Sequence, residues 1–290
     1  MEGTLNSKIG ELAISTDENI NFEEWDGKSG VYIRKGTENH VNPIYYYRGD
    51  VTNNNVLFAN KCWKIVRTTE TGGTKLIYNG TPTSDNKCNG NNSTIVYSKF
   101  NDDSSTEDDV SYIYSDGTNS TIKQAVDTWY TSNMTSYTDM LEDTVWCNDR
   151  SISSQDENLT FFGAYTRNAE THQPSLHCPA EYSLTTSSTQ VSNKLTYPVG
   201  LLTADELTLA GMVWEGYAEE GYLNNYYPWW TMSPYSFLDG VALVFYGYEY
   251  GDLCADREDV EYGVRPAVSL KPGAIVTTGE GTSSKPYIIE

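Results

Sequence analysis

The chain has 290 residues, 38% of them hydrophobic, and its 40 Asp and Glu against 19 Lys and Arg give a formal net charge of -21. A charge of this sign and size repels the phosphate backbone, which argues against a nucleic-acid partner. The sequence contains no run of 18 or more apolar residues, which excludes a membrane-spanning helix, and no charged-then-apolar leader opens it.

No Pro-rich or Gly-rich linker divides the sequence, and its length allows one large domain. Residues 1–28 show little hydrophobic periodicity, so they are interpreted as an N-terminal lead-in with one short helix near residues 5–12. Residues 29–290 are interpreted as a single elaborated domain.

The domain begins with strand-like runs. Residues 31–34 and 44–48 are rich in β-forming side chains and are bounded by Gly or Pro. Residues 63–78 then alternate apolar and polar side chains on either side of a turn, which predicts a β-hairpin. Gly72 and Gly73 in that turn are expected to adopt positive φ angles.

Residues 82–109 are rich in Asn, Ser, Asp and Gly, which predicts a surface loop. The carboxylates near its end are Asp102, Asp103, Glu107, Asp108 and Asp109. Carboxylate oxygens are calcium ligands, but the Asp-x-Asp-x-Asp-Gly spacing of a calcium loop is missing. We interpret these carboxylates as a solvated acidic loop, with bound calcium as the alternative, and predict no metal or cofactor site.

Two helices are predicted from periodicity and capping residues. Residues 121–134 place apolar side chains at helical spacing, and Thr121 with Gln124 forms a capping-box pattern. The second helix begins after Thr203, which forms a capping-box pattern with Glu206.

The stretch from residue 229 to residue 271 differs in composition from the rest of the chain. It opens with Trp229 and Trp230 and closes with an apolar strand that contains Arg265 and Pro266, and we predict a structural role for all four. Between them, Tyr and Phe are mixed with Ser, Asp, Ala, Gly and Arg. Antigen-binding loops use this mixture because it combines rigid contact area with adaptable hydrogen bonding.

The Trp-Trp-x-x-Ser-Pro opening, the Tyr-rich middle and the Gly-Val-Arg-Pro-Ala closing strand, together with Tyr-Tyr-Tyr-Arg-Gly at residues 45–49, resemble variable proteins of diversity-generating retroelements. The resemblance implies an α+β, C-type-lectin-like fold related to the formylglycine-generating enzyme. In that fold two helices flank a twisted, mostly antiparallel sheet that carries long inserted loops.

In that family an error-prone reverse transcriptase rewrites adenines in codons of the C-terminal region. Rewritten Asn codons do not yield Lys, Met, Gln, Trp or Glu. Residues 235–262 contain no Lys, Met, Gln or Trp, whereas Glu249, Glu258 and Glu261 depart from the pattern. The resemblance therefore implies a ligand-binding display protein whose surface, at about residues 229–271, is diversified to bind varied protein or cell-surface ligands.

The predicted ligand contacts share aromatic or charged character and lie within the diversified stretch. They are Tyr235, Phe237, Asp239, Tyr246, Tyr248, Tyr250, Asp252, Asp256 and Arg257. Strand alternation further predicts that Val241 and Leu243 point into the core while Ala242 and Tyr246 face outward. A display surface requires exposed aromatic rings, because buried rings could not be rewritten without destroying the core.

The five cysteines, Cys62, Cys88, Cys147, Cys178 and Cys254, include no C-x-x-C pair, which argues against a zinc site. We predict disulfides Cys62–Cys88 and Cys147–Cys178, because each pair brackets a modest loop, with Cys254 free. The alternative is five reduced core thiols in a cytoplasmic protein. The expected location is extracellular or at the cell surface, with any anchor in a segment outside this chain.

Two other functions are considered. A non-diversified bacterial surface or pilus-associated adhesin on the same scaffold would differ only in lacking a neighbouring reverse transcriptase and template repeat. An enzyme of the formylglycine-generating type would, by resemblance, use a closely spaced Cys pair to bind copper, and Cys254 has no such neighbour. We therefore predict that the chain is not an enzyme.

Overall fold

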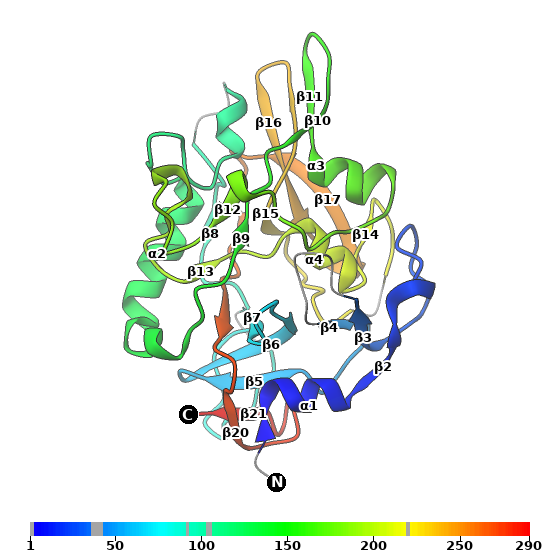
Figure 1. Cartoon of the computed structure of the whole chain (residues 1–290), viewed down its shortest axis with the longest axis vertical. Helices are drawn as coiled ribbons and strands as arrows, with labels where there is room; N and C mark the ends of the chain where they lie inside the picture. The colour runs from blue at the N-terminus through cyan, green and yellow to red at the C-terminus, as the bar shows by residue number, and fades with distance from the viewer. Residues whose placement is uncertain (1–2, 36–42, 91–92, 103–105, 219–220) are drawn as a thin grey trace.

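The computed structural model describes residues 3–35, 43–90, 93–102, 106–218 and 221–290. Within these ranges the chain forms a few helices and two large β-sheets, which occupy the lower and upper halves of Figure 1. The predicted mixture of helix and mostly antiparallel strand is confirmed. The strands, however, divide between two large sheets rather than forming the one sheet that we predicted.

The first sheet contains both ends of the described chain. Its strands are β1 (Gly3–Thr4), β2 (Ala13–Thr16), β3 (Gly30–Arg34), β4 (Ile44–Arg48), β5 (Asn55–Phe58), β6 (Lys61–Thr68), β7 (Thr74–Tyr78), β13 (Val199–Gly200), β19 (Ala267–Leu270), β20 (Ile275–Thr278) and β21 (Tyr287–Ile289). Strand β1 pairs with β20 and β2 with β3, so the N-terminal segment is part of this sheet, and helix α1 (Leu5–Glu11) confirms the predicted short helix.

The predicted hairpin is formed by β6 and β7. Gly72 in its turn has a φ of 91°, as expected, whereas Gly73 has no positive φ. A side chain at Gly73 is excluded for another reason, because its Cβ would lie 2.4 Å from the carbonyl oxygen of Leu270. This glycine therefore allows the turn to approach the end of β19 closely.

The second sheet contains most of residues 229–271. Its strands are β8 (Tyr97–Ser98), β10 (Ile152–Gln155), β11 (Leu159–Phe162), β14 (Val213–Trp214), β15 (Trp229–Leu238), β16 (Val241–Gly247), β17 (Asp252–Arg257) and β18 (Tyr262–Gly263). The β15–β16 and β10–β11 hairpins project side by side at the top of Figure 1. Asp239 and Gly240 turn the first of them with φ angles of 51° and 83°, the conformation for which Asp-Gly is favoured. A small separate sheet pairs β9 (Trp146–Cys147) with β12 (Ser183–Leu184).

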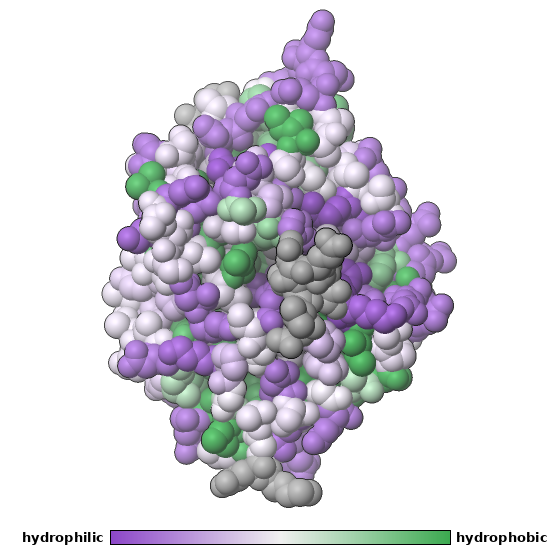
Figure 2. Space-filling model, viewed as in Figure 1, coloured by the Kyte–Doolittle hydropathy of each residue, from purple (hydrophilic) through white to green (hydrophobic). Residues whose placement is uncertain are grey.

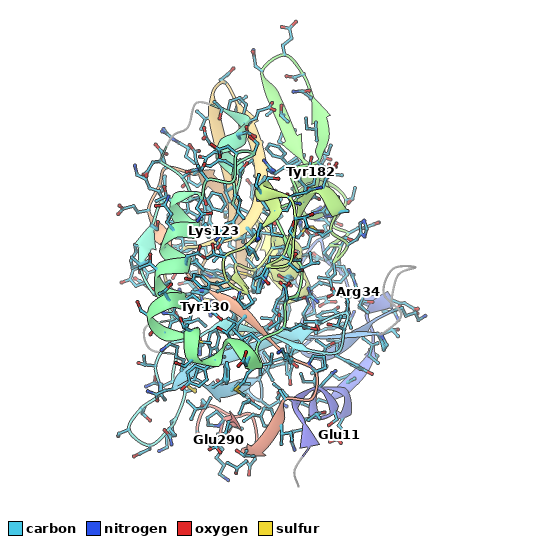
Figure 3. All side chains as sticks on the ribbon, turned by 60° about the vertical axis from the view of Figure 1, so that its left-hand side comes forward. Glu11, Arg34, Lys123, Tyr130, Tyr182 and Glu290 are labelled. Carbon is cyan, nitrogen blue, oxygen red and sulfur yellow. A yellow bond between two sulfur atoms is a disulfide. The ribbon has the colours of Figure 1, made fainter. Side chains whose placement is uncertain are left out.

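The longer helix α2 (Thr121–Asn133) runs along one side of the molecule, where Figure 3 labels its Lys123 and Tyr130. Ser120 caps it by accepting a hydrogen bond from the Lys123 amide, so the predicted capping role of Thr121 is wrong. The other helical segments are α3 (Gly163–Tyr165), α4 (Ala204–Leu209), η1 (Asp17–Asn19), η2 (Glu107–Val110), η3 (Thr135–Met140), η4 (Thr166–Glu170), η5 (Ala180–Tyr182), η6 (Val191–Asn193) and η7 (Glu249–Gly251).

The predicted capping box at the start of α4 is confirmed in both directions. The Glu206 amide donates to Thr203 Oγ1, and the Thr203 amide donates to the Glu206 carboxylate, each at 3.1 Å. Such a box satisfies two backbone donors that the first turn of a helix leaves without partners. It also fixes Glu206 at a position where its carboxylate reaches the first sheet.

A hydrophobic core connects the two sheets. Trp229 and Trp230 are fully buried, and Arg265 and Pro266 are buried beside them, which confirms the structural placement of these four residues. Among the described residues no helix is long and apolar enough to cross a membrane.

Both predicted disulfides, Cys62–Cys88 and Cys147–Cys178, are present, and Cys254 is the remaining thiol. We expect that replacing Cys62 and Cys88 together by Ser lowers the free energy of unfolding by about 3 kcal/mol, because the unfolded chain loses a loop constraint. Urea denaturation measures this difference. Peptide mapping under non-reducing conditions is the companion measurement, and five alkylatable thiols in oxidised protein would contradict the pairing.

Candidate functional site

The nine predicted contact residues lie on β15, β16 and β17 or in the turns between them. Only Asp239, Tyr250 and Arg257 are exposed, and the other six are half-buried. Their rings and carboxylates do not form one continuous patch. Tyr246 and Asp256 belong to one packed aromatic group, Tyr235 belongs to a second, and Tyr248 and Tyr250 belong to an exposed tyrosine surface. The remaining four, Phe237, Asp239, Asp252 and Arg257, lie outside these groups.

The predicted alternation along β16 is wrong for Val241, Ala242 and Leu243. Ala242, Val244 and Phe245 are fully buried, whereas Val241 and Leu243 are half-buried. The β15–β16 register shifts on either side of Pro234, so the simple period of two does not hold along the pair. Apolar side chains stand on both faces of this strand, and the packing of the two sheets, rather than local sequence, selects the buried face.

The first packed group surrounds Trp230. The Tyr246 and Tyr262 ring centroids lie 4.7 Å apart, and the Tyr262 ring lies 4.8 Å from the Trp230 ring. Tyr262 donates a hydrogen bond of 2.5 Å to the carboxylate of Asp256. Burial raises the pKa of Tyr246 well above its usual value. Tyr246 and Asp256 therefore support the indole from one side and are only partly available to a ligand.

The second packed group surrounds Tyr235. Its ring stacks on Trp214 at 5.1 Å and meets Phe245 and Tyr165 edge to face at 5.2 Å each. Phe161 stacks on Tyr165 at 3.8 Å and extends the group. Burial, aided by the nearby charges of Tyr165 and Glu215, raises the pKa of Tyr235 to about 12. Because Tyr235 is half-buried among these aromatic rings, it contributes to the packing of the sheet and is only partly available to a ligand.

The third group is exposed, and we call it the tyrosine surface. It consists of Tyr97, Tyr217, Tyr226, Tyr227, Tyr248 and Tyr250. Tyr248 is half-buried, and the exposed fraction of the other five side chains runs from 45% for Tyr250 to 71% for Tyr226. Monomeric proteins expose few large side chains in clusters, so a group of this kind indicates an interaction site.

Ring contacts join five members of the tyrosine surface in two separate groups. Tyr217 stacks on Tyr250 at 5.3 Å, Tyr226 meets Tyr227 at 4.9 Å, and Tyr97 meets Tyr227 at 6.0 Å. Tyr248 lies in the same β16–β17 turn as Tyr250, and the charge of Glu249 raises its pKa. Tyr250 has a φ of 61°, a left-handed backbone conformation that is uncommon outside Gly, Asn and Asp.

Three segments supply the tyrosine surface: β8, the segment that joins β14 to β15, and the turn that joins β16 to β17. Only Tyr248 and Tyr250 were among the predicted contacts. Tyr97, Tyr217, Tyr226 and Tyr227 were missed, although the high Tyr content of residues 212–228 was a signal that could have drawn attention to three of them. On the face drawn in Figure 2, strongly hydrophobic side chains occur only in small, separate patches.

The predicted charged contacts differ in their surroundings. Asp239 is exposed at the tip of the β15–β16 hairpin. Arg257 is exposed but donates two hydrogen bonds to the carboxylate of Asp259, at 3.0 and 2.7 Å. Burial raises the pKa of Asp252, and one of its carboxylate oxygens lies buried without a hydrogen-bond partner. Of the three, Asp239 is the most accessible to a ligand.

A charged cavity of about 260 Å³ lies between α4 and the first sheet, away from all the predicted contacts. Glu206 accepts hydrogen bonds there from Arg67 at 2.7 Å and Lys75 at 2.8 Å. Nearby, Arg167 forms ion pairs with Asp149 and Asp205, at 2.8 and 2.9 Å. The capping pattern located Glu206 in the sequence but did not show that it neutralises two buried cations.

The acidic loop offers no metal site among the residues that the structure describes, in which no group of three or more His, Cys, Asp or Glu side chains could hold a metal ion. Asp103 of that loop lies outside the described residues. Comparisons of the chain with protein-family models, curated proteins and solved structures yield no match.

Proposed function

We propose that this chain binds protein or cell-surface ligands through the tyrosine surface, and that it is a variable protein of a diversity-generating retroelement on a C-type-lectin-like scaffold. The observation that carries the proposal is the cluster of six tyrosines, five of them exposed. Tyr supplies a large, rigid ring with a hydroxyl at its tip, so it gives contact area and hydrogen bonding at a low entropic cost.

The position of the tyrosine surface supports diversification as well as binding. Tyr248 and Tyr250 lie within residues 235–262, whose composition fits rewritten Asn codons, whereas Tyr97, Tyr226 and Tyr227 lie outside them. Rewriting of these codons would therefore change one part of the tyrosine surface while the tyrosines outside residues 235–262 stay constant. The two disulfides support an extracellular location, where such bridges persist.

Binding is tested with a triple substitution, Tyr217→Ser, Tyr226→Ser and Tyr250→Ser, made in the full chain. We expect wild-type protein to bind members of an array of purified extracellular proteins and glycans, and the variant to lose those signals. Its melting temperature should stay near that of the wild type, because exposed side chains contribute little to stability. Tyr246 is left unchanged because its ring packs against Trp230 and Tyr262.

A matched control replaces three exposed aliphatic side chains elsewhere, Ile14→Ser, Val191→Ser and Ile275→Ser, which are 55–63% exposed. The control should keep every signal of the wild type. If the control loses the same signals, or if the tyrosine variant keeps them, the tyrosine surface is not the binding site.

A non-diversified adhesin on the same scaffold would use the same surface. The sequence of the DNA beside the gene distinguishes the two functions. A reverse-transcriptase gene and a template repeat nearly identical to the codons for residues 235–262 are expected for a diversified protein. Their absence would favour the adhesin.

A further inference from the structure

A second cavity, of about 430 Å³, shares no lining residue with the Glu206 cavity and lies next to the segment that carries Tyr226 and Tyr227, since Asn225 lines it. Five parts of the chain line it: β6, the loop after β7, the segment before β15, the segment between β18 and β19, and the turn between β20 and β21. Their polar side chains include the amides of Asn79 and Asn225 and the hydroxyls of Ser93 and Ser283. The disulfide-bonded Cys88 holds one wall of the cavity in place.

The charge of this cavity is opposite to that of the chain. Lys64 and Arg265 line it, and none of its lining residues that the structure describes is a carboxylate. The whole chain has 40 acidic against 19 basic residues, so a cavity lined by two cations and no acid is unusual for it. Amides and hydroxyls add hydrogen-bond donors and no negative charge.

Arg265 differs from the other buried cations of the described chain. Arg48, Arg67, Lys75 and Lys123, each at most 5% exposed, all form ion pairs with Asp or Glu. Arg265 is 1% exposed and forms no ion pair with any residue that the structure describes.

The contacts of Arg265 are all uncharged. Its guanidinium donates to the carbonyl oxygen of Leu223 at 3.0 Å and to that of Tyr78 at 3.4 Å, and it lies over the Trp229 ring at 4.7 Å. These contacts orient the guanidinium but do not neutralise its charge.

The pKa values of Arg265 and Lys64 both lie below their usual range. Burial lowers the pKa of Arg265 to about 10. Burial, with the repulsion of Arg265 as a second cause, lowers the pKa of Lys64 to about 8, and the charge of Asp50 opposes this only in part. Two cations that repel each other in a partly desolvated cavity are stabilised by an anion placed between them.

We propose that this cavity is a binding site for a small oxyanion, a carboxylate or a phosphate-like group, held by Arg265 and Lys64 and by the surrounding amides and hydroxyls. The planar fork of a guanidinium suits two oxygens of such a group, and the ammonium of Lys64 adds a second charge-assisted contact. None of the six tyrosines of the tyrosine surface lines the cavity, so this proposal can be tested separately from the proposed function.

The test is calorimetric titration of the full chain with sodium phosphate and with sodium acetate, against sodium chloride at matched ionic strength. We expect saturable binding of one oxyanion per chain, with amide chemical-shift changes in NMR spectra centred on Gly90 and Asn225. Tighter binding of acetate would assign the site to carboxylate ligands, and tighter binding of phosphate would assign it to phosphate-like ligands.

The assignment is tested with Lys64→Gln. Arg265→Gln is avoided because it would also remove the contact with Trp229 and destabilise the fold. The loss of one charge-assisted contact is expected to weaken binding about tenfold or more. The matched control is Lys61→Gln, which makes the same charge change on the same strand outside the cavity. The proposal is overturned if neither anion binds more than chloride does, or if both variants weaken binding equally.

Discussion

Replacement of Trp230 by Ala is expected to lower the free energy of unfolding by about 3–5 kcal/mol. The indole is fully buried and packs between Phe100, at a ring distance of 6.1 Å, and Tyr262, at 4.8 Å. Its Nε1 donates to the carbonyl oxygen of Ser98 at 2.9 Å, which attaches β15 to β8. Removing the ring leaves a cavity and an unpaired carbonyl group. Urea denaturation, with the midpoint and slope compared between variant and wild type, measures the loss.

The control for this experiment is Tyr227→Ala, which removes a ring that is 54% exposed. Its effect on the free energy of unfolding should stay within about 0.5 kcal/mol. If Trp230→Ala is as stable as the wild type, the indole does not support the sheet that carries residues 235–262. A change in the slope of the denaturation curve would instead show that the variant has lost two-state unfolding.

Glu206→Gln is expected to cost about 3–5 kcal/mol at neutral pH, because it leaves two buried cations without their shared carboxylate. Lys75 then keeps only the Trp146 ring, 4.4 Å from its ammonium nitrogen, while Arg67 keeps its ion pair with Glu70. Lys75 therefore bears most of the loss. Urea denaturation at pH 7 measures it.

The difference in unfolding free energy between wild type and Glu206→Gln is also expected to depend on pH. Burial alone would raise the pKa of Glu206, but the charges of Lys75 and Arg67 outweigh burial and hold it at about 2, below the usual 4.5. A carboxyl group whose pKa is lower in the folded than in the unfolded protein stabilises the fold at pH values above its unfolded-state pKa. This stabilisation disappears as the pH falls from about 4.5 toward 2. The difference in unfolding free energy between wild type and Glu206→Gln should therefore shrink below about pH 4.5.

A matched control is Glu280→Gln, which breaks the ion pair of Glu280 with Lys285, where both side chains are largely exposed. Exposed pairs contribute little to stability, so this variant should remain close to the wild type across the pH range. A difference between wild type and Glu206→Gln that does not change between pH 7 and pH 3 would mean that Glu206 is not the ionised partner of Lys75.

Several local features were predictable from the sequence because neighbouring residues decide them. The capping box of Thr203 and Glu206 depends on four consecutive residues, and the β6–β7 hairpin depends on alternation around a Gly-Gly turn. The burial of Trp229 and Trp230 follows from their size and apolar surface. The disulfide pairing was also predictable, since each bridge joins cysteines about 30 positions apart or fewer, at separations of 26 and 31 residues.

Tertiary structure alone decided which face of β16 is buried, because Val241 and Ala242 are both apolar and the packing of the two sheets selects between them. It also decided the ring contacts of the tyrosine surface, since Tyr97 meets Tyr227, and Tyr217 meets Tyr250, only when segments distant in the sequence meet at the second sheet. The lack of an ion pair between Arg265 and any described carboxylate is likewise a property of packing. A sequence shows that an arginine is present, but only the folded chain shows which carboxylates come within reach of it.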